Sequence, residues 1–227
     1  MPPVVLDELV ALVSPPACPA CRAPLGGARL RLCPGCAASL PWLPRRCCPR
    51  CSLPRHRGGR CPAAAAAFDR AWSPLAYDGV ARELIGALKF RGALPLAALM
   101  AAQLAANLPP DLRSPMAVVP VPPQPPRRRR RGFDPAAALA DGLAGRLGVA
   151  VVPCLRRTDR EARQVGAGRA QRRRSGRLAI EARAAPPTSA LLVDDVHTTG
   201  ATLEASARAL REAGCDRIAA VTYARTL

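Results

Sequence analysis

The sequence predicts an α/β protein in which a parallel sheet flanked by helices follows a small cysteine-rich module. Two features of the sequence lead to this fold class. Eight of the ten cysteines lie between Cys18 and Cys61. After the alanine run at 63–67, short apolar runs alternate with segments of helical periodicity, as in strands joined by helices. We therefore expect two domains, residues 1–66 and 67–227.

The elements follow from local patterns. Val80, Leu84 and Leu88 recur at helical spacing, and the apolar run 117–121 lies between prolines, as a buried strand would. In chain order we expect a short helix within 4–13, a strand over 71–77, helices from 79 and over 96–107, a strand over 117–121, a helix over 135–147, a strand over 149–154, a basic loop over 156–177, a strand over 190–193, a helix around 203–210 that Gly214 ends, and a strand over 217–223.

Length and composition restrict the class of protein further. The chain has 227 residues, of which 49% are apolar, so it is long and apolar enough to form a hydrophobic core. No run approaches the ~18 apolar residues of a membrane span. The first twenty residues contain Asp7 and Glu8 rather than a basic leader, so we expect a cytoplasmic protein.

The charge is strongly positive, with 34 basic and 16 acidic residues and a formal net charge of +18. Such an excess favours polyanionic partners through counterion release, although a basic surface also serves solubility. Lys89 is the only lysine, so arginine supplies nearly all of this charge. Aromatic residues make up 3% of the chain, which leaves few side chains for stacking on nucleobases.

The first cysteine set has the spacing of a zinc site. Cys18 and Cys21 form one CxxC pair, and Cys33 and Cys36 form a second pair after eleven intervening residues. Each CxxC turn directs two thiolates at one metal ion, and two such turns complete a tetrahedron. A disulfide framework would require an oxidising compartment, which nothing in the sequence suggests. We expect structural Zn²⁺ here.

The second cysteine set is less regular. Cys48 and Cys51 form a CxxC pair, Cys61 follows after nine residues, and Ala64 occupies the position where a symmetrical site would have its fourth cysteine. Cys47 or His56 could complete the site, or the site is degenerate. Spacing also allows the 33/36 pair to share a metal with the 48/51 pair, although we favour sequential sites.

The motif with the clearest chemistry is residues 191–202, where an apolar strand reaches Asp194 and Asp195 and a Thr- and Gly-rich loop opens a helix. Free N–H groups at the start of a helix bind phosphate, and adjacent carboxylates suit the vicinal hydroxyls of a ribose. The sequence therefore predicts a ribose 5-phosphate site. Its residues are Asp194, Asp195, Thr198, Thr199, Gly200, Ala201 and Thr202.

This motif resembles the phosphoribosyl diphosphate motif of type I phosphoribosyltransferases, and the whole chain resembles the ComF family of competence proteins. The resemblance rests on the cysteine-rich start and on Phe68-Asp69-Arg70, Tyr77-Asp78-Gly79, Leu88-Lys89-Phe90, Val119-Pro120-Val121-Pro122, Arg131-Gly132-Phe133 and the loop with Gln164. It implies a type I phosphoribosyltransferase-like parallel sheet with an N-terminal zinc ribbon.

The resemblance also implies roles for individual residues. Asp194 and Asp195 would bind the ribose hydroxyls, and the loop from Thr198 to Thr202 would bind the 5-phosphate. Mg²⁺ would accompany the diphosphate. Gln164 and Arg169 are the catalytic candidates, in a basic loop that either closes over the site or is merely a basic surface. The pyrophosphate loop would include Pro122, Arg127, Arg128, Arg129, Arg130 and Arg131.

Two functional classes remain. One is a binding protein for phosphoribosyl diphosphate and single-stranded DNA that acts in DNA uptake during natural transformation, with a helicase partner, as the family resemblance implies. The other is an active phosphoribosyltransferase, a glycosyltransferase acting on an unknown acceptor. Thr198 stands where purine-salvage relatives have an acid, which argues against purine salvage. His197 replaces a more usual aliphatic residue and either contacts the ligand or packs in the core.

Overall fold

The computed structural model describes residues 16–27, 31–56, 58–114, 116–124, 132–158 and 179–227. The expected helix within 4–13 lies outside these residues. In chain order the elements are α2 (Pro34–Ala38), β1 (Arg70–Trp72), β2 (Leu75–Ala76), α3 (Gly79–Arg91), α4 (Pro95–Asn107), the 3₁₀ turn η1 (Pro110–Leu112), β3 (Ala117–Pro120), α6 (Pro135–Leu147), β4 (Leu155–Arg157), β5 (Ile180–Ala182), β6 (Ser189–His197), α8 (Ala201–Glu212) and β7 (Arg217–Arg225).

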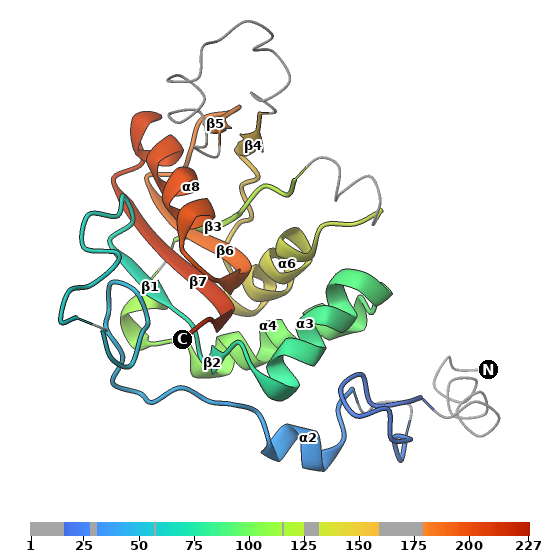
Figure 1. Ribbon diagram of the computed structural model, residues 1–227. Coiled ribbons are helices and arrows are strands. Elements are labelled where there is room, and N and C mark those ends of the chain that lie inside the picture. The colour runs from blue at the N-terminus through green and yellow to red at the C-terminus, as the bar shows by residue number, and fades with distance from the viewer. Residues whose placement is uncertain (1–15, 28–30, 57, 115, 125–131, 159–178) are drawn as a thin grey trace, which may run out of the picture.

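The main sheet is parallel, with strand order β1-β7-β6-β3 and β2 pairing with β7 (Figure 1). β6 and β7 form its centre and pair from Ser189 with Arg217 to His197 with Arg225. β3 extends the sheet through pairs from Ala117 with Ala190 to Pro120 with Val193. The expectation of an α/β fold with a parallel sheet is confirmed. Among the described residues, no helix is both long and apolar enough to cross a membrane.

Alternate residues of the central strands enter two separate cores, because successive side chains of a strand point to opposite faces. Leu191 and Val221 pack with α3, α4 and α6, whereas Leu192 and Ala220 pack with α8. Helices therefore cover both faces of the sheet, with α8 on one face and the other three on the opposite face (Figure 1). This doubly covered arrangement explains the unbroken apolar runs at 190–193 in β6 and 218–221 in β7.

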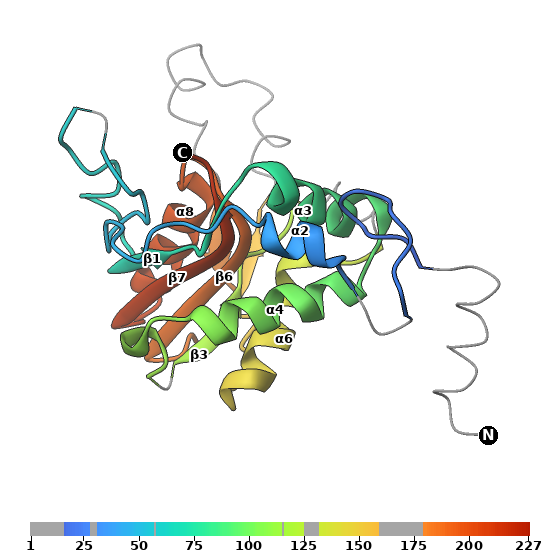
Figure 2. The ribbon, with the colours of Figure 1, turned by 90° about the horizontal axis from the view of Figure 1, so that it is seen from below.

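The N-terminal segment contributes to both cores rather than to one of its own. Cys18, Cys36 and Leu40 belong to the core that contains α3 and α4, and α2 lies beside these helices (Figure 2). Cys51 and Ala63 belong to the core under α8. The two halves of the cysteine-rich segment thus pack against opposite faces of the sheet.

Two strand predictions were wrong in detail. The expected strand over 71–77 is interrupted between β1 and β2 at Ser73 and Pro74, because proline has no N–H for the ladder. The Ser73 N–H instead binds Ser52 Oγ at 2.9 Å. The expected strand over 149–154 is reduced to one bridge between Val151 and Val118.

The carboxyl end of β6 also differs from expectation. The strand continues through Asp194 and Asp195 to His197, so the two carboxylates lie within the strand rather than after it. The start of the expected basic loop forms β4, which pairs antiparallel with β5. The remainder of that loop, over 159–178, lies outside the described residues. The helices at 79–91, 95–107, 135–147 and 201–212 agree closely with prediction.

Candidate functional site

The first cysteine set converges on one point. The sulfur atoms of Cys18, Cys21, Cys33 and Cys36 all lie within 4.8 Å of one another, and the Sγ atoms of Cys21 and Cys33 are 3.7 Å apart. Cys33 also caps α2, since its Sγ accepts the Cys36 N–H at 3.4 Å. Four soft ligands at these separations suit tetrahedral Zn²⁺.

The protonation of these thiols is uneven. Burial raises the pKa of Cys18, but hydrogen bonds from backbone N–H groups of Cys33, Cys21 and Ala20 outweigh it and lower the pKa to about 6. Burial and the neighbouring thiols raise the pKa of Cys36 to about 12. Without a cation the Cys36 thiol therefore stays protonated at neutral pH, whereas a bound divalent metal would stabilise all four thiolates.

The second set also converges, with a histidine as its fourth member. Cys48, Cys51, His56 and Cys61 place their ligand atoms within 4.8 Å of one another. The Sγ atoms of Cys48 and Cys61 are 3.7 Å apart, and Cys51 Sγ lies 3.2 Å from His56 Nε2. Cys47 instead directs its thiol to the Pro44 carbonyl at 3.1 Å. Of the pairings that spacing allowed, the structure assembles the sequential one, giving Cys₄ and Cys₃His sites suited to structural zinc.

Of the predicted ribose phosphate residues, Asp194, Asp195 and Thr202 line a cavity of about 140 Å³ at the carboxyl edge of the sheet, whereas Thr199, Gly200 and Ala201 line a separate cavity. Four segments distant in sequence meet there, because the carboxyl ends of parallel strands lie along one edge. β6 contributes the two carboxylates and α8 contributes a threonine hydroxyl. The lining is Lys89, Val121, Pro122, Pro123, Gln124, Phe133, Asp134, Pro135, Ala136, Arg157, Asp194, Asp195 and Thr202.

Lys89 was named in the sequence only as part of a family motif, and the structure gives it a position in this cavity. Its ammonium lies 2.7 Å from Asp195 Oδ1, with side-chain exposures of 21% and 11%. Lys89 lies in the last turn of α3, where the helix dipole also favours a cation. The sequence could not predict this ion pair, because Asp195 lies more than 100 residues after Lys89 and no local pattern links the two.

The two carboxylates differ in environment. Burial raises the pKa of Asp194 to about 8, with the negative charge of Asp195 adding to the effect. The Asp195 N–H, which donates to Asp194 Oδ1 at 2.8 Å, and the charge of Lys89 oppose this rise. At neutral pH the Asp194 carboxyl is therefore mostly protonated in the free protein, and Lys89 pairs with Asp195.

The loop that opens α8 turns at a glycine in the left-handed conformation. Gly200 has φ of +81°, and a Cβ at this position would lie 2.8 Å from His197 Nε2. Thr198 and Thr199 are exposed, and Thr199 Oγ1 accepts the Ala201 N–H at 3.3 Å. The Ala201 N–H, the first of α8, is thus engaged within the loop, and the loop borders a cavity of about 280 Å³ rather than the one beside the carboxylates.

His197 is a packed residue. It is 3% exposed and contacts Phe68 edge to face, with ring centroids 6.4 Å apart and planes at 89°. Burial, with the neighbouring charge of Arg225, lowers the pKa of His197 to about 3, so the ring is neutral at physiological pH. Of the two alternatives for this residue, the structure supports the packed one.

Other motif residues have structural roles. Asp134 caps α6 by accepting the Ala136 N–H at 3.0 Å. Asp69 accepts the Ile218 N–H at 2.8 Å and pairs with Arg211. The pyrophosphate-loop arginines from Arg127 to Arg131 and the catalytic candidates Gln164 and Arg169 lie outside the described residues.

Comparison with known proteins identifies the N-terminal part of the chain. Residues 9–65 match the family model for a double zinc ribbon domain. This range includes both metal clusters, so the sequence expectation of a zinc ribbon at the N-terminus is confirmed. No curated protein matches the chain. A double zinc ribbon is compatible with nucleic-acid binding, which agrees with the basic charge of the chain.

Proposed function

We propose that the protein is a ComF-type, type I phosphoribosyltransferase-like protein that binds phosphoribosyl diphosphate at the cavity beside Asp194 and Asp195. The observation that supports this proposal is the meeting of these vicinal carboxylates with Thr202 at the start of α8. Carboxylates accept hydrogen bonds from ribose hydroxyls, and the N–H groups that open α8 bind a 5-phosphate. The carboxylates would therefore bind the ribose hydroxyls, and the start of α8, a few residues further along the chain, would bind the 5-phosphate.

Two cations in the cavity lining suit the diphosphate. Lys89 and Arg157 both line it, beside the segment Val121–Gln124 that follows β3. Ribose hydroxyls that donate to Asp195 would share this carboxylate with Lys89. Mg²⁺ belongs to the proposal as the ion carried by the diphosphate oxygens, since a hard divalent cation takes oxygen ligands. The arginines from Arg127 to Arg131, adjoining this segment in sequence, would add guanidinium groups.

The test is calorimetry with phosphoribosyl diphosphate and Mg²⁺. Hydrogen bonds from ribose hydroxyls to these two side chains are each worth about 1–3 kcal/mol, so the double variant D194A/D195A should bind at least ~30-fold more weakly. D141A, at an exposed position on α6, is the matched control and should bind like the wild type. Wild-type affinity in a folded double variant would exclude this cavity as the ligand site.

We further propose that the protein binds single-stranded DNA without base preference and supports DNA uptake, with a helicase as its partner. The net charge of +18 supports this, and so does the double zinc ribbon domain, a class compatible with nucleic-acid binding. Contacts would be mainly to phosphates. Fluorescence anisotropy should give an affinity that falls with salt, with a log–log slope of about −0.7 per phosphate contacted. A salt-independent affinity, or no binding at low salt, would contradict this.

Phosphoribosyl transfer to an acceptor is the second candidate. The neighbourhood of Phe133 and the proline segment favours it, because an apolar wall beside the carboxylates excludes water from a reacting ribose centre. In this reaction the acceptor displaces diphosphate from the ribose, so Mg²⁺-diphosphate appears as a product. Release of pyrophosphate with candidate acceptors distinguishes an enzyme from a binding protein, and loss of release in Q164A and R169A would assign the catalytic loop.

A further inference from the structure

The starting point is a buried cation near the end of the last strand. Arg225 is 4% exposed, and its Nη1 donates to the carbonyls of His197 at 3.1 Å and Thr198 at 2.7 Å. Its Nε has no hydrogen-bond partner within the part of the chain that the structure describes, and no carboxylate there pairs with it. A buried guanidinium without a negative partner is destabilising.

The negative partner lies on the second zinc ribbon. Arg225 and Cys51 line the same cavity of about 280 Å³, together with Thr199 and Gly200 of the loop that opens α8. Glu204 also lines this cavity, but its carboxylate accepts the Ala67 N–H and pairs with Arg208, which leaves the metal ligand Cys51 as the group at this cavity that becomes anionic when zinc is bound.

Charge balance supports this pairing. Zinc bound by three thiolates and a neutral imidazole has a net charge of −1, from +2 for the metal and −3 for Cys48, Cys51 and Cys61. Arg225 contributes +1, so the zinc-loaded cluster and the guanidinium together are neutral. The Cys₄ cluster would carry −2, and it packs on the opposite face of the sheet.

We infer that Arg225 is the electrostatic partner of the second zinc centre and that it transmits metal occupancy to the loop 198–202 through the carbonyls of His197 and Thr198. The second ribbon is then a support of the phosphate loop, and zinc at this site favours the loop conformation that accepts the ligand. The effect on ligand affinity rests on the proposed function, whereas the effect on the loop itself does not.

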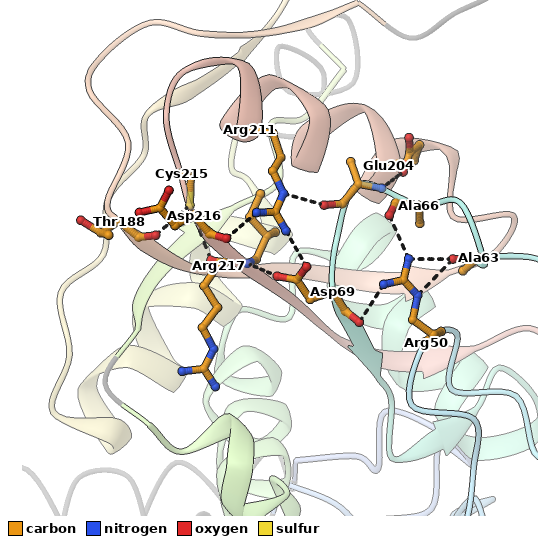
Figure 3. Close-up of polar contacts among 12 residues, drawn as sticks. Arg50, Ala63, Ala66, Asp69, Thr188, Glu204, Arg211, Cys215, Asp216 and Arg217 are labelled. Carbon is orange, nitrogen blue, oxygen red and sulfur yellow. Dashed lines mark hydrogen bonds and ion pairs between the residues drawn. The ribbon is translucent and has the colours of Figure 1, made fainter.

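A second connection runs through the alanine run between ribbon and sheet (Figure 3). Arg50 lies between ligands Cys48 and Cys51, and its guanidinium donates to the carbonyls of Ala63 and Ala66, at 3.2 and 2.9 Å. The Ala67 N–H donates to Glu204, in the first turn of α8, at 2.7 Å.

Arg211, two turns further along α8, donates from Nε to the Ala67 carbonyl at 3.1 Å and pairs with Asp69 (Figure 3). The second ribbon is therefore connected to α8 through the alanine run, and it also shares a cavity with Arg225 of β7. The first ribbon has a different attachment, since Arg91 at the end of α3 donates to the Pro19 carbonyl.

The experiment uses the full zinc-loaded chain and three variants, with a chelator competition assay and hydrogen–deuterium exchange in the absence of ligand. R225M removes the charge and keeps the volume. We expect it to release one of two zinc ions about tenfold faster and to raise exchange of amides 198–203 about tenfold, because coupling between two sites is reciprocal. C61S removes the second zinc and should raise the same exchange. C21S removes the first zinc and should leave amides 198–203 protected.

Unchanged zinc release and unchanged loop exchange in R225M would overturn the inference, as would equal effects of C21S and C61S on the loop. Exchange of α4 and α6 reports whether each variant is folded. If R225M is unfolded, R225K replaces it in the test because it retains the positive charge. We expect R225K to release the second zinc at the wild-type rate. Binding of phosphoribosyl diphosphate is measured separately. Wild-type protein that does not bind it refutes the proposed function, while zinc release and exchange still decide the inference.

Discussion

Ionisation of the buried Asp194 should destabilise the ligand-free protein at alkaline pH, and the variant D194N should remove this effect. Burial and the adjacent charge of Asp195 raise the pKa of Asp194 from an ordinary 3.8 to about 8. D194N keeps the shape of the side chain and removes the ionisable group. We expect the variant to be more stable than the wild type at alkaline pH, although it loses a ligand contact.

The sign follows from proton linkage. A carboxyl whose folded pKa is raised binds more protons in the folded state between pH ~4 and ~8, so the free energy of unfolding falls as pH rises through this window. Ionising a group with this pKa costs about 6 kcal/mol at ~1.36 kcal/mol per pH unit. Asp194 retains some contact with solvent, so we expect D194N to recover on the order of 1–3 kcal/mol at pH 9.

The assay is urea denaturation of zinc-loaded wild type and D194N at pH 5, 7 and 9. The difference in unfolding free energy should be small at pH 5, grow through pH 7 and level off above pH 8. D141N, at an exposed position of α6, is the control and should show no such growth. If the difference between D194N and wild type is constant from pH 5 to pH 9, Asp194 is ionised throughout and its pKa is not raised.

Four other outcomes are expected. K89M leaves the carboxylates without their cation, so it should lower stability at pH 8 by about 1–3 kcal/mol in denaturation and weaken ligand binding. G200A forces a Cβ to 2.8 Å from His197 Nε2 at positive φ, and calorimetry should show weaker binding by a folded protein. G142A places a methyl 2.8 Å from one on α4 and should lower the free energy of unfolding by about 1–2 kcal/mol, whereas G145A, in open space on the same helix, should raise it. Metal analysis of purified protein should give about two zinc ions per chain, and one ion or none would exclude the second ribbon site.

The sequence predicted the helices well because each has local signals. Asp78 precedes α3 and accepts the Gly79 N–H at 2.8 Å, and Gly92 ends the helix in the left-handed conformation. Asp134 and Gly148 do the same for α6. Strand limits depend on partners instead. The continuation of β6 through Asp195 to His197 requires β7 beside it, and that pairing has no local signature.

The metal-ligand sets were predictable where adjacent residues carry the chemistry, as in the CxxC pairs. The candidate site was not predictable where the partner is distant in sequence. Lys89 meets Asp195 across more than 100 residues. His56 completes the second cluster where spacing alone also allowed Cys47, because the choice depends on how the chain turns between Cys51 and Cys61.

The positions of the two ribbons have a consequence for the ligand cavity. Pro19, from the first ribbon, accepts a hydrogen bond from Arg91, two residues after Lys89 at the end of α3. The second ribbon contacts the opposite side of the sheet, through Arg225 and the start of α8. The cation and the phosphate loop are thus each attached to a different metal cluster. Helix ends and loops are the least stable parts of a fold. Attachment to a turn stabilised by a metal would restrain the end of α3 and the loop before α8 without a larger hydrophobic core. The ribbons therefore restrain both sides of the cavity.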